Sequence, residues 1–484
     1  MATGVDRFYI GGEWVEPKSG DVSEILNPAT EEVIATAAVS SPKDAVAAIE
    51  AARVAFDEGP WPGMAPAERG AIVRRMGEIL HTRRRELGDL LREEVGATLY
   101  LIKTVQVSWA IEAFALSAEW AETFPWEEEA PSRTKPVTVR SLLVREPVGV
   151  VSAITPFNYP LFVNSWKVAP AIAMGNTVVL KPAPWTPLDA FEIARAAEEA
   201  GLPPGVLNVI GGGGVDVGEE MVGNPMVDMV SFTGSLTAGR SVGARAAQTV
   251  KKVQLELGGK SAAIVLDDAS AEDVAMRIMG NCMLHAGQGC GCTTRLLVPE
   301  TMHDEVVERT AAMCALMPIG DPADPSVVLG PLIREQHRAR VESYVQAGID
   351  EGATLVTGGR RPPQLDKGFF YEPTVFTDVR NDMRIAQEEI FGPVLAVIRY
   401  RDEDEAVRIA NDSVFGLGGA VYSPNRPRAL AFSRRLRTGF VGIGGGMLNF
   451  HGSWGGYKQS GVGREWRAGL EEYTELKHLT WVEP

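Results

Sequence analysis

The sequence predicts an α/β protein with two domains, each built on a mainly parallel sheet with helices on its faces. From Pro147 onward, short apolar strands alternate with helical stretches, which is typical of such sheets. A chain of 484 residues is also longer than one hydrophobic core usually serves. Hydrophobic residues at 45% and charged residues at 23% are ordinary globular values, so we expect the chain to fold except at its termini.

The first part of the chain is expected to hold short strands and then helices. Ser41-Pro42 combines a good N-cap residue with proline at the first helical position. Ile72, Met76 and Ile79 belong to an apolar stripe at helical spacing in the longest helix. The expected strands are 8–10, 13–15 and 32–39, and the expected helices are 45–56, 67–95 and 103–123.

Residues 136–145 interrupt the helices with a strand-like segment that partly alternates polar and apolar residues. A ribbon of this kind is often a two-sided or edge element. We therefore expect an oligomer contact there.

The rest of the chain alternates strands and helices in two series, with a boundary near Gly258-Gly259. The first series has expected strands 150–154, 177–180, 206–210, 229–232 and 253–256 and a helix over 187–200. The second has expected strands 262–266, 295–298, 395–400, 420–422 and 440–443 and helices 270–285, 301–316, 403–411 and 426–436. We identify no internal repeat.

Composition excludes several classes of function. The net charge of −16, with no offsetting basic domain, argues against nucleic acid as a partner, and the short basic cluster 81–85 fits a solvated helix face. Four cysteines form no disulfide framework, and the six scattered histidines show no metal-ligand spacing, so we expect no metal. The N-terminus is no signal peptide and no apolar run reaches about 18 residues, so we expect a soluble cytoplasmic protein with no membrane partner.

Unusual residues follow four of the predicted strands, where open α/β sheets bind ligands. Gly234-Ser235 before a helix offers backbone N–H groups that suit a pyrophosphate, although such a pair is often only a cap. Lys181 at a strand end could meet a ribose or its phosphate, and 211–214 could be a ligand loop or a plain turn. The four strand ends are 155–160, 181–184, 233–239 and 257–260.

A turn of small residues holds two of the cysteines, Cys290 and Cys292, just before the strand 295–298. Glycines on both sides leave the Cys290 sulfur uncrowded. A free cysteine usually behaves as a small buried hydrophobe, so the turn alone does not assign a nucleophile.

Eight motifs together carry a resemblance that none carries alone. In order they are 155–160, 180–183, 232–235, 255–260, 287–290, 387–393, 411–417 and 456–465. Over essentially its whole length the chain resembles the NAD(P)-dependent aldehyde dehydrogenase superfamily, of the hydrolytic, non-acylating type. The resemblance implies two Rossmann-like parallel-sheet α/β domains plus a small β oligomerisation ribbon.

By the same resemblance, residues 1–124 and 146–258 form the dinucleotide-binding domain and 259–452 the domain that bears the nucleophile. Segments 125–145 and 466–484 are expected to make a homodimer or a homotetramer. The sequence does not choose between the two states.

The family's chemistry implies a role for each matching residue. Cys290 is the nucleophile that forms a thiohemiacetal with the aldehyde and then a thioester. The Asn158 amide and the Cys290 N–H hold the oxyanion, and Glu256 activates the hydrolytic water. Lys167 and Glu475 align with residues that support proton transfer, although a salt bridge explains them equally well, and Cys292 is read as a bystander.

The resemblance also implies the residues that bind the cofactor. Lys181 and Glu389 hold the two riboses, Ser235 meets the pyrophosphate, and Phe391 packs near the nicotinamide. Many NAD-specific relatives have an acid where this chain has Pro184, so the sequence allows NADP as well as NAD. The full set is Thr155, Pro156, Phe157, Lys181, Ala183, Pro184, Gly214, Phe232, Thr233, Gly234, Ser235, Glu256, Leu257, Gly258, Cys290, Glu389 and Phe391.

The substrate pocket is expected to be apolar and aromatic, with no basic residue to hold an acidic substrate. Gly289 and Gly291 stand where relatives have bulkier residues, which suggests room for an uncharged aromatic or medium-chain aliphatic aldehyde. The expected lining is Phe157, Tyr159, Val163, Trp166, Gly289, Gly291, Leu448 and Trp454, the last two on the loop 447–454.

Three other functions compete with this interpretation. A coenzyme-A-acylating dehydrogenase generally lacks the glutamate found here at Glu256, so hydrolysis is favoured. A catalytically silent protein on the same fold is disfavoured by Cys290, Glu256 and Asn158. A cofactor-free thiol hydrolase would leave the nucleotide-site motifs without a purpose.

Overall fold

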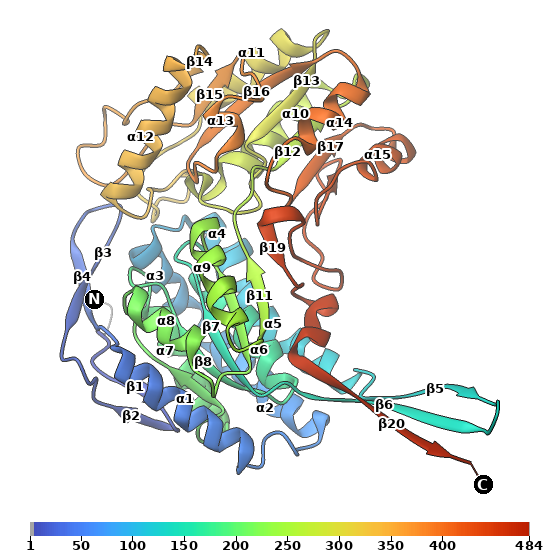
Figure 1. Ribbon diagram of the computed structural model, residues 1–484. Helices are drawn as coiled ribbons and strands as arrows, with labels where there is room; N and C mark the ends of the chain where they lie inside the picture. The colour runs from blue at the N-terminus through green and yellow to red at the C-terminus, as the bar shows by residue number, and fades with distance from the viewer. Residues whose placement is uncertain (1–3, 484) are drawn as a thin grey trace.

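The protein folds into two α/β bodies with a long ribbon that projects from one of them (Figure 1). This is a computed structural model, and it describes residues 4–483. The C-terminal strand runs out along the ribbon, whereas the N-terminal segment lies on the opposite side of the same body (Figure 1).

The first sheet has eight strands, of which the central five are parallel. Its edges are antiparallel and are formed by the N-terminal hairpin on one side and a short late strand on the other. In spatial order the strands are β19 (Gly461–Val462), β11 (Lys252–Glu256), β10 (Met229–Thr233), β7 (Val150–Ile154), β8 (Thr177–Lys181), β9 (Leu207–Val209), β1 (Phe8–Ile10) and β2 (Glu13–Val15). A separate hairpin joins β3 (Val22–Leu26) to β4 (Val33–Ala38).

The helices of this body include one break that the sequence did not predict. The single helix expected over 67–95 is two helices, because the backbone leaves the helical region at Arg83. The Arg83 guanidinium pairs with Glu199 at 2.5 Å and with Glu192 at 3.6 Å, so it joins the break to α7. The helices are α1 (Pro42–Asp57), α2 (Pro66–Thr82), α3 (Arg84–Val95), α4 (Leu99–Leu101), a π-helix (Ile102–Gln106), α5 (Ser108–Glu122), α6 (Pro160–Ala173), α7 (Leu188–Ala200), α8 (Val215–Gly223) and α9 (Leu236–Ala247).

The stretch Leu99–Glu122 is long and apolar enough to cross a membrane by length and composition. In this structure 44% of its most apolar 18 residues are buried, and α5 packs against α2 and α6. Core helices of globular proteins pass the same test, so the stretch is weak evidence for a membrane span.

The second sheet has seven strands, all parallel to their neighbours except β14. In order they are β14 (Thr354–Thr357), β15 (Thr374–Thr377), β16 (Val394–Tyr400), β13 (Arg295–Pro299), β12 (Ala262–Val265), β17 (Gly419–Tyr422) and β18 (Gly442–Ile443). Its helices are α10 (Ala271–Ile278), a π-helix (Met279–Met283), a 3₁₀ helix (Leu284–Gly287), α11 (His303–Ala315), α12 (Glu335–Asp350), α13 (Arg384–Gln387), α14 (Glu403–Asn411) and α15 (Arg426–Ser433). Two more 3₁₀ helices follow at Lys458–Ser460 and Arg467–Tyr473.

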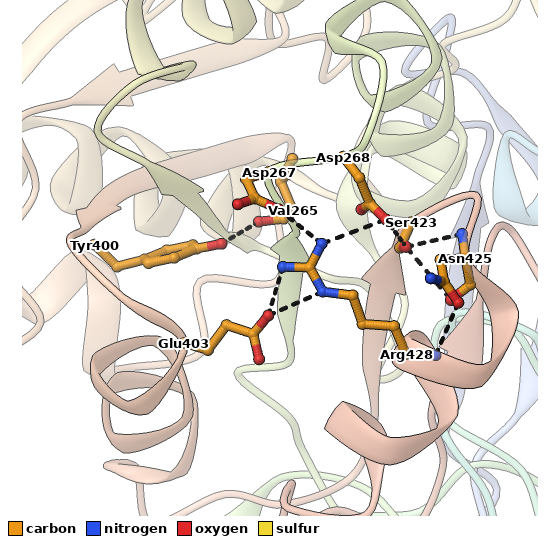
Figure 2. Close-up of polar contacts among 8 residues, drawn as sticks. All are labelled: Val265, Asp267, Asp268, Tyr400, Glu403, Ser423, Asn425 and Arg428. Atoms are coloured by element: carbon orange, nitrogen blue, oxygen red, sulfur yellow. Dashed lines mark hydrogen bonds and ion pairs between the residues drawn. The ribbon is translucent and has the colours of Figure 1, made fainter.

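The Arg428 guanidinium joins α14 and α15 to the end of β12 (Figure 2). Arg428 on α15 contacts Asp267 at 2.7 Å and Asp268 at 3.3 Å, just after β12, and Glu403 on α14 at 2.6 Å. The Tyr400 hydroxyl donates to the Val265 carbonyl at the same end of the sheet. These contacts fix one end of the second sheet.

The hydrophobic residues form two cores, and the chain passes from one to the other between Leu257 and Ala262. The expected boundary at Gly258-Gly259 falls in this gap. The late residues Phe450, Trp466 and Tyr473 return to the first core. The first part of the expected oligomerisation segment 466–484 thus contributes Trp466 and Tyr473 to the first core, and its part in assembly stays a prediction.

The ribbon is a three-stranded antiparallel sheet of β5 (Glu127–Arg133), β6 (Val139–Pro147) and β20 (Thr474–Val482). β6 replaces the expected segment 136–145, and β20 pairs with it from Thr474 opposite Pro147 to Val482 opposite Val139. Leu476 and Trp481 on β20 are 53% and 49% exposed. These exposed apolar side chains belong to the projecting part of the molecule.

Candidate active site

The strand ends singled out in the sequence meet at one edge of the first sheet. Ile154 lies opposite Lys181 on one side and Phe232 on the other, and Thr233 lies opposite Glu256. Because these strands are parallel and in register, the segments that follow them leave the sheet together. The predicted convergence of the motifs is therefore what the structure shows.

The cysteine turn follows a distorted end of α10. The helix expected over 270–285 is α-helical only to Ile278 and continues as π-helix and 3₁₀ turns. His285 and Ala286 have φ of 55° and 52°, a conformation that bulky residues seldom adopt. This backbone carries the chain away from the helix and into the turn that presents Cys290.

Cys290 is half-buried and Cys292 lies beyond it in the same turn, where the Cys292 N–H donates to the Gly289 carbonyl at 3.1 Å. Burial raises the pKa of the Cys290 thiol well above its usual range, and Glu389 and Glu256 raise it further. Burial also raises the pKa of Cys292, to about 12. Both groups are thus thiols at neutral pH until positive charge is brought near them.

Asn158 is tied to the cysteine turn by its own side chain. Its side-chain Nδ2 donates to the Gln288 backbone carbonyl at 2.7 Å. Its backbone carbonyl accepts from Gln106 Nε2 at 2.9 Å and lies 2.7 Å from His285 Nε2. An asparagine amide has two N–H groups, so one is left for a further acceptor. Asn158 is therefore buried, held in place from both bodies, and still able to donate.

Glu256 ends β11 with both carboxylate oxygens buried and without a hydrogen-bond partner within the described chain. Burial raises the pKa of Glu256 well above its usual range, Glu465 raises it further, and Lys167 opposes the rise. A carboxyl group in this state suits a general base that takes a proton from water.

The residue that pairs with Lys167 is not the one the sequence predicted. Lys167 Nζ lies 2.9 Å from Glu465 Oε1, in a fully buried position on α6. Glu475 instead lies on β20, is 56% exposed and contacts Lys252 at 3.2 Å. The expected role of Glu475 beside Lys167 is therefore wrong, because Glu475 lies on a strand of the ribbon, outside the first core. Glu465 is the carboxylate that contacts Lys167.

The adenosine side of the expected nucleotide site lies at the end of β8. Lys181 is 6% exposed, and burial lowers its pKa to about 8, with Asp216 opposing that shift. Pro184 packs on the glycine loop, since a Cβ on Gly212 would lie 2.3 Å from the Pro184 Cα. Gly214, two residues after Gly212 in this loop, is the N-cap of α8.

The pyrophosphate side lies at the start of α9. Ser235 is its N-cap and accepts a hydrogen bond from Ala238 N–H at 3.3 Å, so the hydroxyl is used within the helix. The first N–H groups of a helix have no intrahelical partner and favour an anion. The Thr233 hydroxyl beside them is buried and has no partner in the described chain, which fits a polar ligand at this edge.

The nicotinamide side is built around Glu389. Its Oε1 accepts from the Gly259 N–H at 2.9 Å, and a Cβ on Gly258 would lie 2.2 Å from Oε2, so only glycine fits there. Burial raises the pKa of Glu389 to about 7. The rings of Phe157 and Phe391 pack edge to face with centroids 5.8 Å apart. The residues present fit a dinucleotide that runs from Lys181 to Glu389.

The glycines beside the nucleophile face two aromatic residues. A Cβ on Gly289 would lie 2.8 Å from Cys292 Sγ and 3.4 Å from the Tyr159 hydroxyl, and a Cβ on Gly291 would lie 3.0 Å from the Trp454 ring. Tyr159 and Trp454 thus lie against the nucleophile turn, as the predicted lining requires. Val163 is one turn along α6 from Tyr159, and its N–H donates to the Tyr159 carbonyl.

Phe162 and Trp109, behind this lining, were not predicted from the sequence. Trp166 is 2% exposed and packs on Phe450 with ring centroids 4.7 Å apart, and Phe162 contacts both Trp109 at 5.8 Å and Phe450 at 6.3 Å. Trp166 is therefore part of the core behind the pocket wall, and Leu448 packs on the same core. The helical spacing of Phe162 and Trp166 could have predicted that both side chains lie on the same face of α6.

Comparison with known proteins agrees with this geometry. A family model described as the aldehyde dehydrogenase family matches residues 14–479. Betaine aldehyde dehydrogenase of Bacillus subtilis (strain 168) is 42% identical, over 98% of this chain and 96% of the relative. The expected superfamily resemblance and the aldehyde dehydrogenase class of the enzyme are confirmed.

Solved structures give the same result for the fold. A Mycobacterium tuberculosis aldehyde dehydrogenase complexed with NAD+ superimposes with a TM-score of 0.96 at 44% identity, covering 99% of this chain and 98% of the other. A mutant of aldehyde dehydrogenase C from Pseudomonas syringae, in complex with NAD+ and octanal, has a TM-score of 0.93 at 41% identity, covering 98% and 96%. The predicted fold is confirmed, and the chain belongs to the aldehyde dehydrogenase family.

Proposed function

We propose that this protein oxidises an uncharged aldehyde to the carboxylic acid with NAD+, through a covalent intermediate on Cys290. One observation carries the proposal: Asn158 of the first body hydrogen-bonds the turn that bears Cys290, with Nδ2 2.7 Å from the Gln288 carbonyl. The nucleophile and its oxyanion donor thus form one unit, and Glu256 ends a strand of the adjacent sheet edge.

The first step forms a bond between the Cys290 sulfur and the aldehyde carbon. The thiolate is the reactive form, and a positively charged nicotinamide ring near the sulfur would lower the raised pKa of Cys290. The carbonyl oxygen becomes an oxyanion, and the free Asn158 N–H and the Cys290 backbone N–H are the donors that stabilise it. The glycines on either side of Cys290 place no side chain of their own next to the sulfur.

The cofactor supplies the hydride acceptor for the second step. Lys181 and Glu389 would hold its riboses, and the start of α9 would hold its pyrophosphate. Pro184 supplies no negative charge against a 2′-phosphate, so NADP+ is a second cofactor to be tested.

The last step hydrolyses the thioester on Cys290. Glu256 takes a proton from water, the resulting hydroxide attacks the acyl carbon, and the carbon–sulfur bond breaks to release the acid and the Cys290 thiolate. The raised pKa of Glu256 makes it a stronger base than an ordinary carboxylate once it is ionised. A buried glutamate in this place favours water over coenzyme A as the acyl acceptor.

The substrate class follows from the wall of the pocket. Tyr159, Trp454 and the aromatic residues behind them, Phe162 and Phe450, offer apolar surface and no basic group. Gly289 and Gly291 add no side chain between the nucleophile turn and this wall, where a Cβ would lie 2.8 Å from Cys292 Sγ or 3.0 Å from the Trp454 ring. We therefore propose aromatic or medium-chain aliphatic aldehydes rather than acidic semialdehydes.

Assembly and location are further parts of the proposal. β6 and β20 present an exposed ribbon with apolar side chains, and a homodimer or homotetramer would cover them. The four cysteines are free thiols, as is usual in the cytoplasm.

The test is a spectrophotometric assay of the purified protein with a panel of aldehydes and both nucleotides. We expect reduction of NAD+ without added coenzyme A, highest kcat/KM for uncharged aromatic or medium-chain aldehydes, and no turnover in Cys290→Ala. An absolute need for coenzyme A would contradict the hydrolytic step. A preference for short acidic semialdehydes would contradict the substrate class, and turnover by Cys290→Ala with none by Cys292→Ala would contradict the choice of nucleophile.

A further inference from the structure

Behind the candidate base lies a continuous chain of buried hydrogen bonds. It starts at the Lys167–Glu465 pair, passes through Ser231 and Gln254, and ends at Tyr473. Lys167, Ser231 and Gln254 are all 0% exposed, and Tyr473 is 2% exposed.

The sheet explains why these side chains meet. Ser231 on β10 lies directly opposite Gln254 on β11, and Gln254 lies two residues before Glu256 on the same strand. Side chains two apart on a strand point to the same face, so Gln254 and Glu256 share one face of the sheet. α6 brings Lys167 to that face, where its Nζ lies 2.9 Å from Ser231 Oγ.

The hydrogen bonds have a fixed direction. Lys167 Nζ can only donate, so Ser231 Oγ must accept from it and pass its own hydrogen to Gln254 Oε1, 2.6 Å away. Gln254 Oε1 also accepts from the Tyr473 hydroxyl at 3.3 Å, and its Nε2 donates to the Arg464 carbonyl at 2.6 Å. Ser231 Oγ and Glu465 Oε1 are therefore the two acceptors of the Lys167 ammonium, and Gln254 orients the Ser231 hydroxyl so that it can accept.

We propose that Ser231 and Gln254 are positioning residues that fix the Lys167 ammonium in contact with Glu465, and that through this pair they set the acidity of Glu256. The proposal rests on the proposed function, because Glu256 has to act as the base. It goes beyond the pairing of Lys167 by assigning two residues that never touch the substrate.

The sign of the effect follows from the charges around Lys167. Glu256 on β11, Glu465 and Arg464 on the segment after β19, and Tyr473 at the end of the last 3₁₀ helix all lie close to this network. Loss of the Ser231 hydroxyl removes one of the two acceptors that fix the ammonium, so the Lys167 side chain can move away from its place beside Glu465. With this positive charge farther away, Glu256 becomes harder to ionise and its pKa rises.

The experiment is the pH profile of kcat for Ser231→Ala, Gln254→Met and the double variant. We expect the acidic limb of Ser231→Ala to move up by about half a unit to one unit, which lowers kcat about three- to tenfold on that limb. Gln254→Met, which leaves the Ser231 hydroxyl without its acceptor, should move the limb in the same direction. The double variant should shift less than the sum of the two, because both act through Lys167.

Two variants separate positioning from packing. Ser231→Thr keeps the hydroxyl and should restore the wild-type limb. Ser152→Ala on the adjacent strand is the matched control. Ser152 is also 0% exposed, but its hydroxyl has no hydrogen-bond partner in the part of the chain that the structure describes. This substitution should leave the pH profile unchanged. The melting temperature of each variant shows whether it is folded.

The same profiles are measured without cofactor, as hydrolysis of p-nitrophenyl acetate, in which Glu256 activates water on the acyl enzyme. A folded Ser231→Ala or Gln254→Met with the wild-type acidic limb in both assays would overturn the inference while the proposed function stands. Absence of aldehyde oxidation by the wild-type protein would instead overturn the proposed function.

Discussion

Lys167 donates a hydrogen bond to Glu465 over 2.9 Å, and neither side chain is more than 10% exposed. The two residues are 298 positions apart, so a late segment of the chain returns to complete a site on an early helix. Glu256 lies close enough to this pair for Glu465 to raise its pKa and for Lys167 to lower it. The base of the proposed reaction therefore depends on a buried ion pair.

Replacement of Glu465 should affect both stability and turnover. Glu465→Gln leaves the Lys167 ammonium buried without its counter-charge, and breaking such a pair costs about 3 kcal/mol. We expect a lower urea midpoint and a kcat reduced about tenfold, because the proton from Glu256 loses its acceptor. Glu475→Gln is the matched control on the exposed ribbon and should stay within about twofold of wild type. Equal effects of the two substitutions would contradict the placement of Glu465.

The glycine next to the nucleophile should set the size of the substrate. In Gly289→Ala the new Cβ would lie 2.8 Å from Cys292 Sγ and 3.4 Å from the Tyr159 hydroxyl, so it would displace one or both of these side chains at the pocket wall. We expect kcat/KM for an aromatic or medium-chain aldehyde to fall about tenfold, and that for acetaldehyde to change much less.

Gly280→Ala is the control. Gly280 lies in the same part of the chain as Gly289, but a Cβ there would have no described neighbouring atom within 4 Å. A uniform loss for all aldehydes in Gly289→Ala would show that the substitution disturbs the nucleophile rather than the space beside it.

Glu389 should slow the reaction of Cys290 with alkylating agents. After burial, Glu389 is the largest cause of the raised pKa of Cys290, so Glu389→Gln should increase the thiolate fraction at pH 8. We expect iodoacetamide to modify Cys290 about two- to fivefold faster, measured on the peptide by mass spectrometry. Glu388→Gln, which removes a carboxylate paired with Arg384 at the surface, should leave the rate unchanged. An unchanged rate of alkylation in Glu389→Gln would show that the Glu389 charge does not affect the pKa of the Cys290 thiol.

Lys260 should make the stability of the protein depend on pH. It is 2% exposed, its Nζ has no hydrogen-bond partner in the described chain, and burial lowers its pKa to about 7. A lysine in an unfolded chain has a pKa of about 10.4. Below pH 7 both states carry the proton and the folded state bears the full cost of the buried charge. Above pH 7 only the unfolded chain keeps the proton, so the cost shrinks as the pH rises towards 10.

Lys260→Met should therefore be more stable than the wild type at pH 6, by about 2 to 4 kcal/mol, with a smaller difference at pH 9. Urea unfolding at both pH values measures this. A difference that grows with pH would contradict the sign of the argument.

The part of the site that could be predicted from the sequence is the part that depends on short local patterns of residues. Each strand end that gathers at the sheet edge is a short apolar run followed by a distinctive turn, as at Lys181 and Gly234. The order of strands and helices then brings these ends together, because parallel strands share a carboxyl edge. Cys290 was recognisable only through the resemblance that the eight motifs carry together, because its turn alone does not assign a nucleophile.

The part that could not be predicted depends on packing between distant segments. Glu465 and Glu475 lie ten positions apart in the sequence, and only the return of 466–473 to the first core shows which of them meets Lys167. The break at Arg83 depends likewise on Glu192 and Glu199 of α7. Neither contact leaves a signal in the residues next to it.

The central claim is that Cys290 carries the acyl group and Glu256 releases it. It is tested most directly by mixing Glu256→Gln with NAD+ and an aromatic aldehyde and following one turnover. The account predicts a rapid burst of about one equivalent of reduced cofactor per site, then a stalled enzyme whose acyl adduct maps to Cys290 by tandem mass spectrometry. An adduct on Cys292, or steady turnover with no burst, would contradict it.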